Sequence, residues 1–245
     1  MCSFATSARS GRQWAAGLLL VLPVVISIAD AGGWLSSSVA TLFGGADNAA
    51  ALFNAYMLRE AFAAVATALA FILLLPRSID RVVRFALWLG VVTNIYISAF
   101  YLLPVLFPPL LAGFPAAVGS TLLLLAVIVS CYACTLFVGH SALTMKERLW
   151  SLPLLLPYIM SFVTFYSPEF VQNIWSAGDV QNLLLAIAVV WSVVYGVALW
   201  RLAFSSLFAG RGGAAGDDAS SSFSPLNIYM LAVALLSFVA VRLAG

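Results

Sequence analysis

Long apolar stretches separated by short charged or Pro- and Gly-rich breaks run along the whole chain. A helix needs about 20 apolar residues to cross the hydrocarbon core of a bilayer, and charged residues mark where such a helix leaves the membrane. The pattern therefore predicts seven transmembrane helices. They cover roughly residues 14–34, 51–76, 82–106, 116–138, 152–166, 180–202 and 225–244.

Two connecting segments differ from the other breaks. Residues 32–50, rich in Gly, Ser and Ala, are long enough to include a short interfacial helix near residues 36–43. Residues 210–224 are rich in Gly, Ser and Asp, which is typical of a flexible loop. No internal repeat divides the chain. We therefore expect an all-α, polytopic membrane bundle, with residues 1–245 in a single transmembrane domain.

The composition supports the membrane assignment. Charged residues make up 8% of the chain, against about 25% in typical soluble domains. Such a chain has too few polar residues to cover a soluble core, so the lipid bilayer must serve as its solvent. A net charge of +2 without any long basic run gives no indication of nucleic-acid binding.

The basic residues fall mainly on one side of the predicted bundle. If the N-terminus is cytoplasmic, every Lys and Arg other than Arg59 and Arg242 lies on the cytoplasmic side. The positive-inside rule favours that orientation, which also places residues 210–224 in the cytoplasm. In a competing interpretation residues 1–31 are a cleaved signal peptide, because basic residues precede an apolar run that ends in Ala29-Asp30-Ala31. Cleavage would leave six spans and the same sidedness.

This topology sorts the nine carboxylates into two groups. Four share cytoplasmic loops with basic residues or the flexible loop, and we interpret them as solvated charges: Asp80, Glu147, Asp217 and Asp218. The other five lie on the opposite side, where two of them fall within predicted helices. Asp30 is near the outer end of the first helix, and Glu60 lies about 13 Å into the second at 1.5 Å per residue.

Glu60 is the main site candidate, because a charged side chain at the centre of a membrane helix costs about 2.5 to 3.5 kcal/mol on insertion scales. Ala63, Ala64 and Thr67 follow it at helical spacing. Small residues favour helix contacts in membranes, so Glu60 is expected to face the bundle. Arg59 diverges by about 100° around the helix and is expected to extend outward instead of pairing with Glu60. Alternatively, the helix begins at Arg59 and the pair only marks the membrane interface.

The third predicted helix carries a polar stripe. Gly90, Asn94, Ser98 and Tyr101 recur at spacings of three or four residues. Polar groups in lipid must find partners, so the stripe is expected to face inward. Asn94 falls near the middle of the membrane and Tyr101 nearer the acidic side. The stripe either contributes to a site or forms interhelical hydrogen bonds, which are worth about 0.6 to 2 kcal/mol.

Neither a redox site nor a metal site is indicated by the remaining reactive residues. Cys131 and Cys134 form a C-x-x-C pattern inside a helix, away from the accessible helix N-terminus that thiol chemistry prefers. We interpret both as small packing residues. His140 has no second His, Cys or carboxylate at metal-ligand spacing nearby. We therefore expect no metal and no cofactor.

A one-sided membrane pocket with a carboxylic acid and aromatic side chains fits proton-initiated cyclisation of a polyprenyl substrate. Desolvation keeps a carboxyl group protonated, aromatic faces stabilise a carbocation, and apolar walls exclude water. We expect Glu60 to be the general acid, with Asp30 as its helper or a second acid. Asn94 and Tyr101 would orient the substrate. Later helices would complete the pocket with three more aromatic residues: Tyr158, Tyr166 and Trp191.

The C-terminal side of the chain carries a recognisable pattern. The segment from Leu156-Pro157 to Tyr166-Ser167-Pro168, followed by Gln181 and an apolar run with Trp191, resembles the membrane-bound terpene cyclases of fungal meroterpenoid pathways. The shared pattern is LP, an apolar run, SP, then Q and W. The resemblance implies an endoplasmic-reticulum enzyme of secondary metabolism. Its substrate would be a hydrophobic prenylated small molecule with a farnesyl chain, often as the epoxide.

The alternative is a non-enzymatic membrane protein, either a small-solute transporter or channel or an accessory subunit of a membrane complex. A transport pathway needs inward polar residues at every depth of the membrane. The inner half of this chain offers little beyond Ser130, Thr135 and Asn227. This asymmetry favours a pocket that opens to one side. The sequence identifies no protein partner.

Overall fold

The computed structural model describes the chain outside residues 1–10, 31–32, 46, 108–115, 156–177 and 209–245, and every regular element in the described part is helical. The long helices are α1 (Gly11–Ala29), α3 (Ala49–Leu74), α4 (Arg81–Leu106), α6 (Ala116–Val138) and α10 (Gly178–Ala203). Two short α-helices, α2 (Trp34–Ala40) and α7 (Met145–Ser151), lie between them. Four 3₁₀ segments extend the helices: η1 (Thr41–Phe43), η2 (Leu75–Arg77), η3 (Leu152–Leu155) and η4 (Ser206–Phe208).

Within the described residues, five helices are long and apolar enough to cross a membrane. They are Gly11–Ala29, Ala49–Arg77, Arg81–Leu106, Thr121–Val138 and Ala186–Phe208. All five correspond to predicted spans, and α2 with η1 confirms the short helix expected near residues 36–43. Apart from η3, the predicted spans 152–166 and 225–244 lie outside the described residues, as does the loop 210–224. The count of seven spans therefore stays a prediction.

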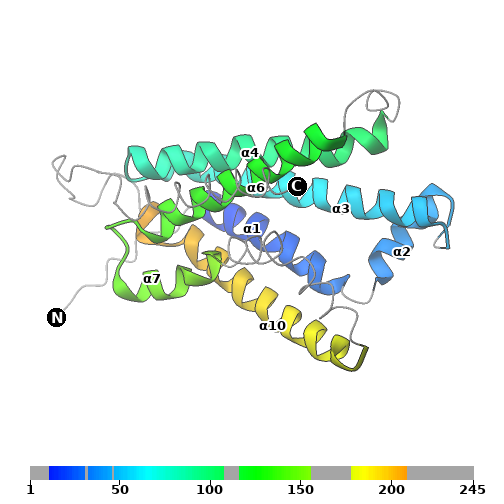
Figure 1. The fold of residues 1–245 in the computed structure, drawn as a ribbon. Helices are drawn as coiled ribbons and strands as arrows, with labels where there is room; N and C mark the ends of the chain where they lie inside the picture. Colours follow the sequence, from blue (N-terminus) through cyan, green and yellow to red (C-terminus); the bar gives the residue numbers. More distant parts are fainter. Residues whose placement is uncertain (1–10, 31–32, 46, 108–115, 156–177, 209–245) are drawn as a thin grey trace.

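The long helices run side by side as a bundle (Figure 1). Helix α3 packs against α1 and α4, α4 also packs against α6, and α1 packs against α10. Helix α2 lies at one end of the bundle against α3, and α7 lies at the other end against α10. We call these the α2 end and the α7 end. Since α1 contacts both α3 and α10, cleavage after residue 31 would remove a central helix.

Small side chains allow the helices to approach closely. Buried alanines recur along the whole of α3. On α1, a Cβ added to Gly17 would lie 3.0 Å from the ring of Trp200 on α10. On α4, a Cβ added to Gly90 would lie 2.4 Å from the ring of Phe71 on α3. Lipid tails are as apolar as the helices, so this close packing is a main source of helix association in a membrane.

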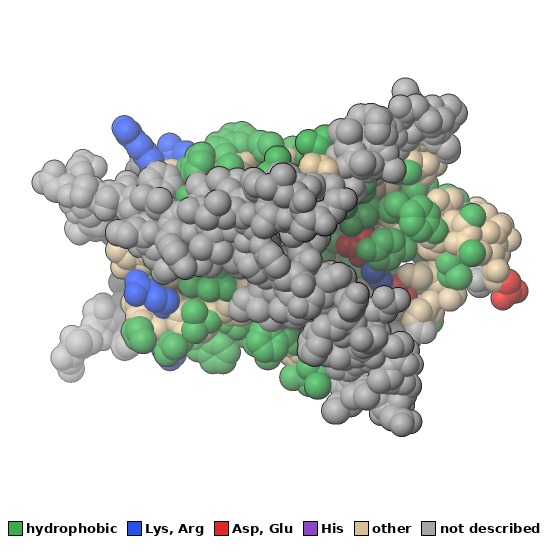
Figure 2. All heavy atoms as spheres, viewed as in Figure 1, with side chains coloured by type: hydrophobic (Ala, Val, Ile, Leu, Met, Phe, Trp, Pro, Cys, Tyr) green, Lys and Arg blue, Asp and Glu red, His purple; other side chains and the backbone are tan. Residues whose placement is uncertain are grey.

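The outer face of the bundle is strongly apolar. Large hydrophobic side chains project from the long helices, and Figure 2 shows hydrophobic side chains along the upper and lower edges of the molecule, between its two ends. Examples with their exposed fractions are Phe62 (49%), Trp88 (52%), Val92 (60%), Ile95 (55%) and Val190 (64%). Water would disfavour so much exposed apolar surface, whereas hydrocarbon accommodates it.

The charged residues separate between the two ends. In the described part of the chain, seven basic residues belong to the α7 end: Arg12, Arg77, Arg81, Arg84, Lys146, Arg148 and Arg201. Arg59 is the basic residue of the α2 end among the described residues, and Figure 2 shows acidic side chains toward that end. By the positive-inside rule this distribution favours a cytoplasmic α7 end, and the orientation stays a prediction.

Two acidic residues of the α7 end are structural, so their interpretation as solvated loop charges is wrong. Asp80 caps α4 by accepting a 2.9 Å hydrogen bond from the Val83 amide, and its other oxygen lies 2.6 Å from His140 Nε2. Glu147 completes a capping box with Thr144 and accepts a 2.8 Å hydrogen bond from the Ser206 amide. Each carboxylate thereby joins segments that are far apart in the sequence. Asp217 and Asp218 lie outside the described residues.

Candidate functional site

Glu60 lies well inside a helix, because α3 already begins at Ala49. The side chain of Asn48 caps α3, accepting hydrogen bonds from the amides of Ala50 at 2.9 Å and Ala51 at 3.4 Å. An asparagine at this position satisfies amides that the first helical turn leaves unpaired. Glu60 is then about 16 Å along the helix axis from Ala49. The alternative that this helix begins at Arg59 is wrong.

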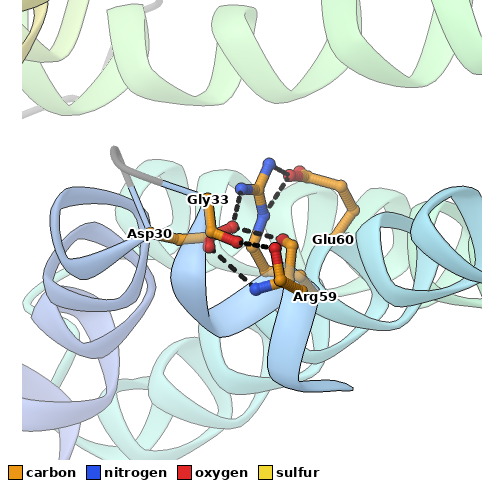
Figure 3. Close-up of polar contacts among 6 residues, drawn as sticks. Asp30, Gly33, Arg59 and Glu60 are labelled. Atoms are coloured by element: carbon orange, nitrogen blue, oxygen red, sulfur yellow. Dashed lines mark hydrogen bonds and ion pairs between the residues drawn. The ribbon is translucent and has the colours of Figure 1, made fainter. Parts of the chain in front are cut away.

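Arg59 lies between two carboxylates (Figure 3). Its Nη1 is 2.8 Å from Asp30 Oδ2, and its Nη2 and Nε are 2.8 Å and 3.2 Å from Glu60 Oε1. The expectation that Arg59 would diverge from Glu60 is therefore wrong. The long arginine side chain bends back along the helix, which lets one guanidinium reach its own neighbour and a residue of α1's C-terminal end together.

Asp30 is the most enclosed member of this network, with 2% of its side chain exposed. It directly follows α1, and the chain then turns sharply at Gly33, whose φ of 74° is readily adopted only by glycine. The turn brings the start of α2 over Asp30. The Ser36 amide donates to Oδ1 at 2.8 Å, and the Ser36 hydroxyl donates to Oδ2. Asp30 thus links α1, α2 and α3.

These contacts change the acidity of Asp30. Burial raises the pKa of the carboxyl group, but the hydrogen bonds from Ser36 and the bond and charge of Arg59 together lower it below the usual value of 3.8. A pKa that is lower in the folded state stabilises the fold above the unfolded-state pKa. This stabilisation is lost as the pH falls through the folded-state pKa.

We therefore expect acid to destabilise the protein less when Asp30 is replaced by asparagine. The wild-type thermal midpoint should fall as the pH drops below about 4, and Asp30→Asn should remove part of that fall. Glu147, whose pKa is also lowered, contributes to acid sensitivity in both proteins and cancels in the comparison. Thermal unfolding of both proteins in one neutral detergent between about pH 7 and pH 3 measures the difference. Equal slopes would contradict the role given to Asp30.

Aromatic side chains lie beside the charged network. The guanidinium of Arg59 is 5.0 Å from the ring centre of Tyr56, one helical turn earlier. Tyr56 packs edge-on against Tyr101 of α4, with 6.3 Å between the ring centres. Tyr101 in turn packs against Phe100 at 5.7 Å. The structure therefore brings Tyr101 to the network as the sequence predicted, although through Tyr56.

Among the described residues, two further predicted site residues, Asn94 and Trp191, do not join this group. Asn94 is buried, as expected for the polar stripe, but its amide donates to the Gly90 carbonyl of its own helix at 2.8 Å. Trp191 is 38% exposed on α10, a helix that packs against α1. Tyr158 and Tyr166 lie outside the described residues. Asn94 thus bonds within its own helix, and this bond is not the interhelical hydrogen bond that the sequence left as an alternative.

Sequence reasoning missed two members of the site. Tyr56 lies three and four residues before Arg59 and Glu60, so helical spacing alone places it on the same side of α3. Ser36 carries no comparable signal, because only the turn at Gly33 brings it onto Asp30. Cys134 packs against the hydrophobic core, in keeping with its interpretation as a packing residue.

In comparisons with protein-family models, with curated proteins and with solved structures, no match to this chain is found.

Proposed function

We propose that the chain is a membrane-embedded terpene cyclase in which the Asp30–Arg59–Glu60 network delivers the initiating proton. The observation that carries this proposal is the charge balance of the network. Two carboxylates share one guanidinium, so the group has a net charge of −1 when both are ionised. Charge is costly in a low-dielectric environment, and uptake of one proton makes the network neutral.

In this proposal Glu60, and not Asp30, donates the proton to the substrate. Both oxygens of Asp30 accept hydrogen bonds, from Ser36 and Arg59, and these favour its ionised form. Glu60 is bonded through Oε1 alone, and its Oε2 has no hydrogen-bond partner in the described part of the chain. Its side chain is also more accessible, at 31% exposed against 2% for Asp30. Of the two roles expected for Asp30, helper or second acid, the proposal takes the helper that holds Arg59.

The proton transfer is balanced without any further reactant. Glu60 gives its proton to an epoxide oxygen or a terminal alkene carbon, and the substrate π electrons form the new ring bond. The carboxylate left behind pairs with Arg59, which stabilises it in place. The final carbocation loses a proton, and the Glu60 carboxylate takes up one proton, so the acid is regenerated and the net reaction is an isomerisation. Tyr96 and Phe100, whose rings lie 6.5 Å apart on α4, supply aromatic faces near Tyr101 for the cationic intermediates.

The substrate class follows from this chemistry. A farnesyl-type chain partitions into the bilayer and would reach the α2 end from the apolar surface of the bundle. A eukaryotic host would hold such an enzyme in the endoplasmic reticulum, as the resemblance implies. The isomerisation itself requires neither a metal nor a redox cofactor.

Replacing Glu60 with glutamine tests the proposal. Microsomes that contain the full chain are incubated with farnesylated aromatic substrates and their epoxides, and cyclised products are measured by mass spectrometry. We expect Glu60→Gln to lose product formation, because the amide keeps the shape of the side chain without a transferable proton. Asp47→Asn, an exposed acid at the same end, should retain it. If Glu60→Gln still forms cyclised product at equal expression, Glu60 is not the general acid.

A structural role is the second candidate, and one observation favours it. The network joins α1, α2 and α3, so it also serves as a clamp for the α2 end. A non-enzymatic protein would need no more from these residues. In that case the wild type yields no product from any prenyl substrate, while Asp30→Asn still lowers its stability. A continuous transport pathway gains no support, since Thr93 and Asn94 both bond to carbonyls of their own helix.

A further inference from the structure

A second candidate site lies at the opposite end of the bundle. A cleft of about 610 Å³ separates α7 from the last turns of α10. Its polar and aromatic lining includes Lys146, Trp150, Ser151, Trp200, Arg201 and Ser205. The cleft is therefore large enough for a small polar group, and it is far along the bundle from Asp30 and Glu60.

Two basic side chains of the cleft are available to bind an anion. Lys146 comes from α7 and Arg201 from α10, and neither side chain has a hydrogen bond or ion pair to another residue in the described part of the chain. Arg201 stacks over the ring of Trp150 with its guanidinium carbon 4.1 Å from the ring centre. Stacking holds the plane of the guanidinium while its N–H edges stay available for a bidentate contact.

The acidic residue that lines the cleft, Glu147, already has hydrogen-bond partners for its carboxylate. Glu147 accepts hydrogen bonds from the Thr144 and Ser206 amides and from both of their hydroxyls. Burial raises the pKa of Glu147, but these bonds together lower it below the usual value of 4.5. Glu147 therefore positions α7 against η4 and leaves Lys146 and Arg201 without an internal counter-ion.

The cleft lies where a helix long enough to span a membrane ends, which is the level at which lipid phosphate groups are expected. Helix α7 exposes Met145 (69%), Leu149 (55%) and Trp150 (41%), which is typical of a segment at the membrane interface. Arg201 lies in the last turn of the adjacent spanning helix. Basic pockets between helices at this level are suited to the head groups of anionic lipids.

We propose that this cleft binds a phosphate-bearing group through Lys146 and Arg201, with Ser151 and Ser205 as neighbouring hydroxyls. The group is either the head-group phosphate of an anionic lipid or a soluble phosphate compound, since both present the same oxygens. The inference rests on the α7 end alone and does not depend on the proposed cyclase activity.

Titration of tryptophan fluorescence tests the site, because Trp150 and Trp200 line it. The full chain is purified in a neutral detergent and titrated at about 0.15 M salt, which suppresses long-range attraction. The probes are dihexanoyl phosphatidic acid, dihexanoyl phosphatidylcholine and inorganic phosphate. We expect saturable binding of phosphatidic acid, weakened about tenfold by Lys146→Gln and by Arg201→Gln, as for one charge-assisted hydrogen bond. Arg81→Gln, an exposed cation of the same end outside the cleft, should bind like the wild type.

The probes separate the two sources of phosphate. Saturable binding of inorganic phosphate that competes with phosphatidic acid supports the site with a soluble ligand. Binding of phosphatidic acid alone supports it with a lipid. Lys146→Gln keeps the test decisive if Arg201→Gln folds poorly, because Lys146 is exposed and makes no internal bond. Unsaturable binding, or equal losses in Lys146→Gln and Arg81→Gln, would overturn the proposal.

Discussion

Replacing Arg59 with glutamine is expected to lower the free energy of unfolding of the bundle by about 3 kcal/mol. Arg59 compensates two carboxylates, and Asp30 has only 2% of its side chain exposed. Removal of one partner from a buried ion pair costs about 3 to 5 kcal/mol, since the other charge stays buried without a counter-ion. Arg59 and Glu60 are partly exposed, at 24% and 31%, which places the expected loss at the lower end.

A double-mutant cycle measures this loss. The free energy of unfolding is determined in mixed micelles for Arg59→Gln, Asp30→Asn and the double variant, with Arg81→Gln as the control for removal of an exposed arginine. The double variant should recover part of the loss, because neutral Asp30 no longer needs a counter-ion. Strict additivity, or a loss in Arg59→Gln no larger than in Arg81→Gln, would show that the network contributes little to the fold.

Replacing Gly90 with alanine is expected to destabilise the contact between α3 and α4 by about 1 to 3 kcal/mol. The new Cβ would lie 2.4 Å and 2.5 Å from two ring carbons of Phe71. Phe71 is itself held in the core, 5% exposed and packed 6.2 Å from Phe137, so its ring has little room to move. Alanine favours a helix over glycine by about 1 kcal/mol, which offsets only part of the strain.

The same substitution at Gly11 is the matched control, because nothing lies within 4 Å of a Cβ added there. Thermal unfolding in one detergent should give a clearly lower midpoint for Gly90→Ala and little change for Gly11→Ala. Gly90→Ala combined with Phe71→Leu should regain part of the loss, since leucine lacks the ring carbons that clash. A Gly90→Ala midpoint at or above that of the wild type would mean that the helices separate at little cost.

The candidate site was only partly predictable. The hydropathy pattern pointed to Glu60 and Asp30, because a carboxylate in an apolar membrane helix is energetically unfavourable and therefore rare without a function. The pairing of Arg59 was missed because a spacing argument treats a side chain as a fixed vector, whereas arginine is long enough to bend toward its neighbour. Ser36 was missed because its contact depends on a turn at Gly33 and not on any periodicity.

The acids at the α7 end show the same limit. Asp80 and Glu147 lie among basic loop residues, and composition alone favours solvent for both. In the structure Asp80 meets His140 and Glu147 meets Ser206, in each case across about 60 positions of sequence. Such pairs form because several helices end at the α7 end of the bundle. A local sequence pattern does not show which helix ends lie next to each other.

Hydropathy along the chain was enough to predict a helical membrane protein and the positions of the long helices that the structure describes. Twenty-residue apolar runs admit only helices in a bilayer, since every backbone amide and carbonyl must be paired within the run. The predicted spans at α1, α3, α4, α6 and α10 follow from that constraint. The partners of charged side chains follow from the tertiary structure: Arg59 joins Asp30 to Glu60, and Lys146 and Arg201 line one cleft. These contacts depend on how separate helices are rotated and packed against one another. Apolar surfaces alone allow many such arrangements, whereas close contacts at small residues such as Gly90 favour one of them.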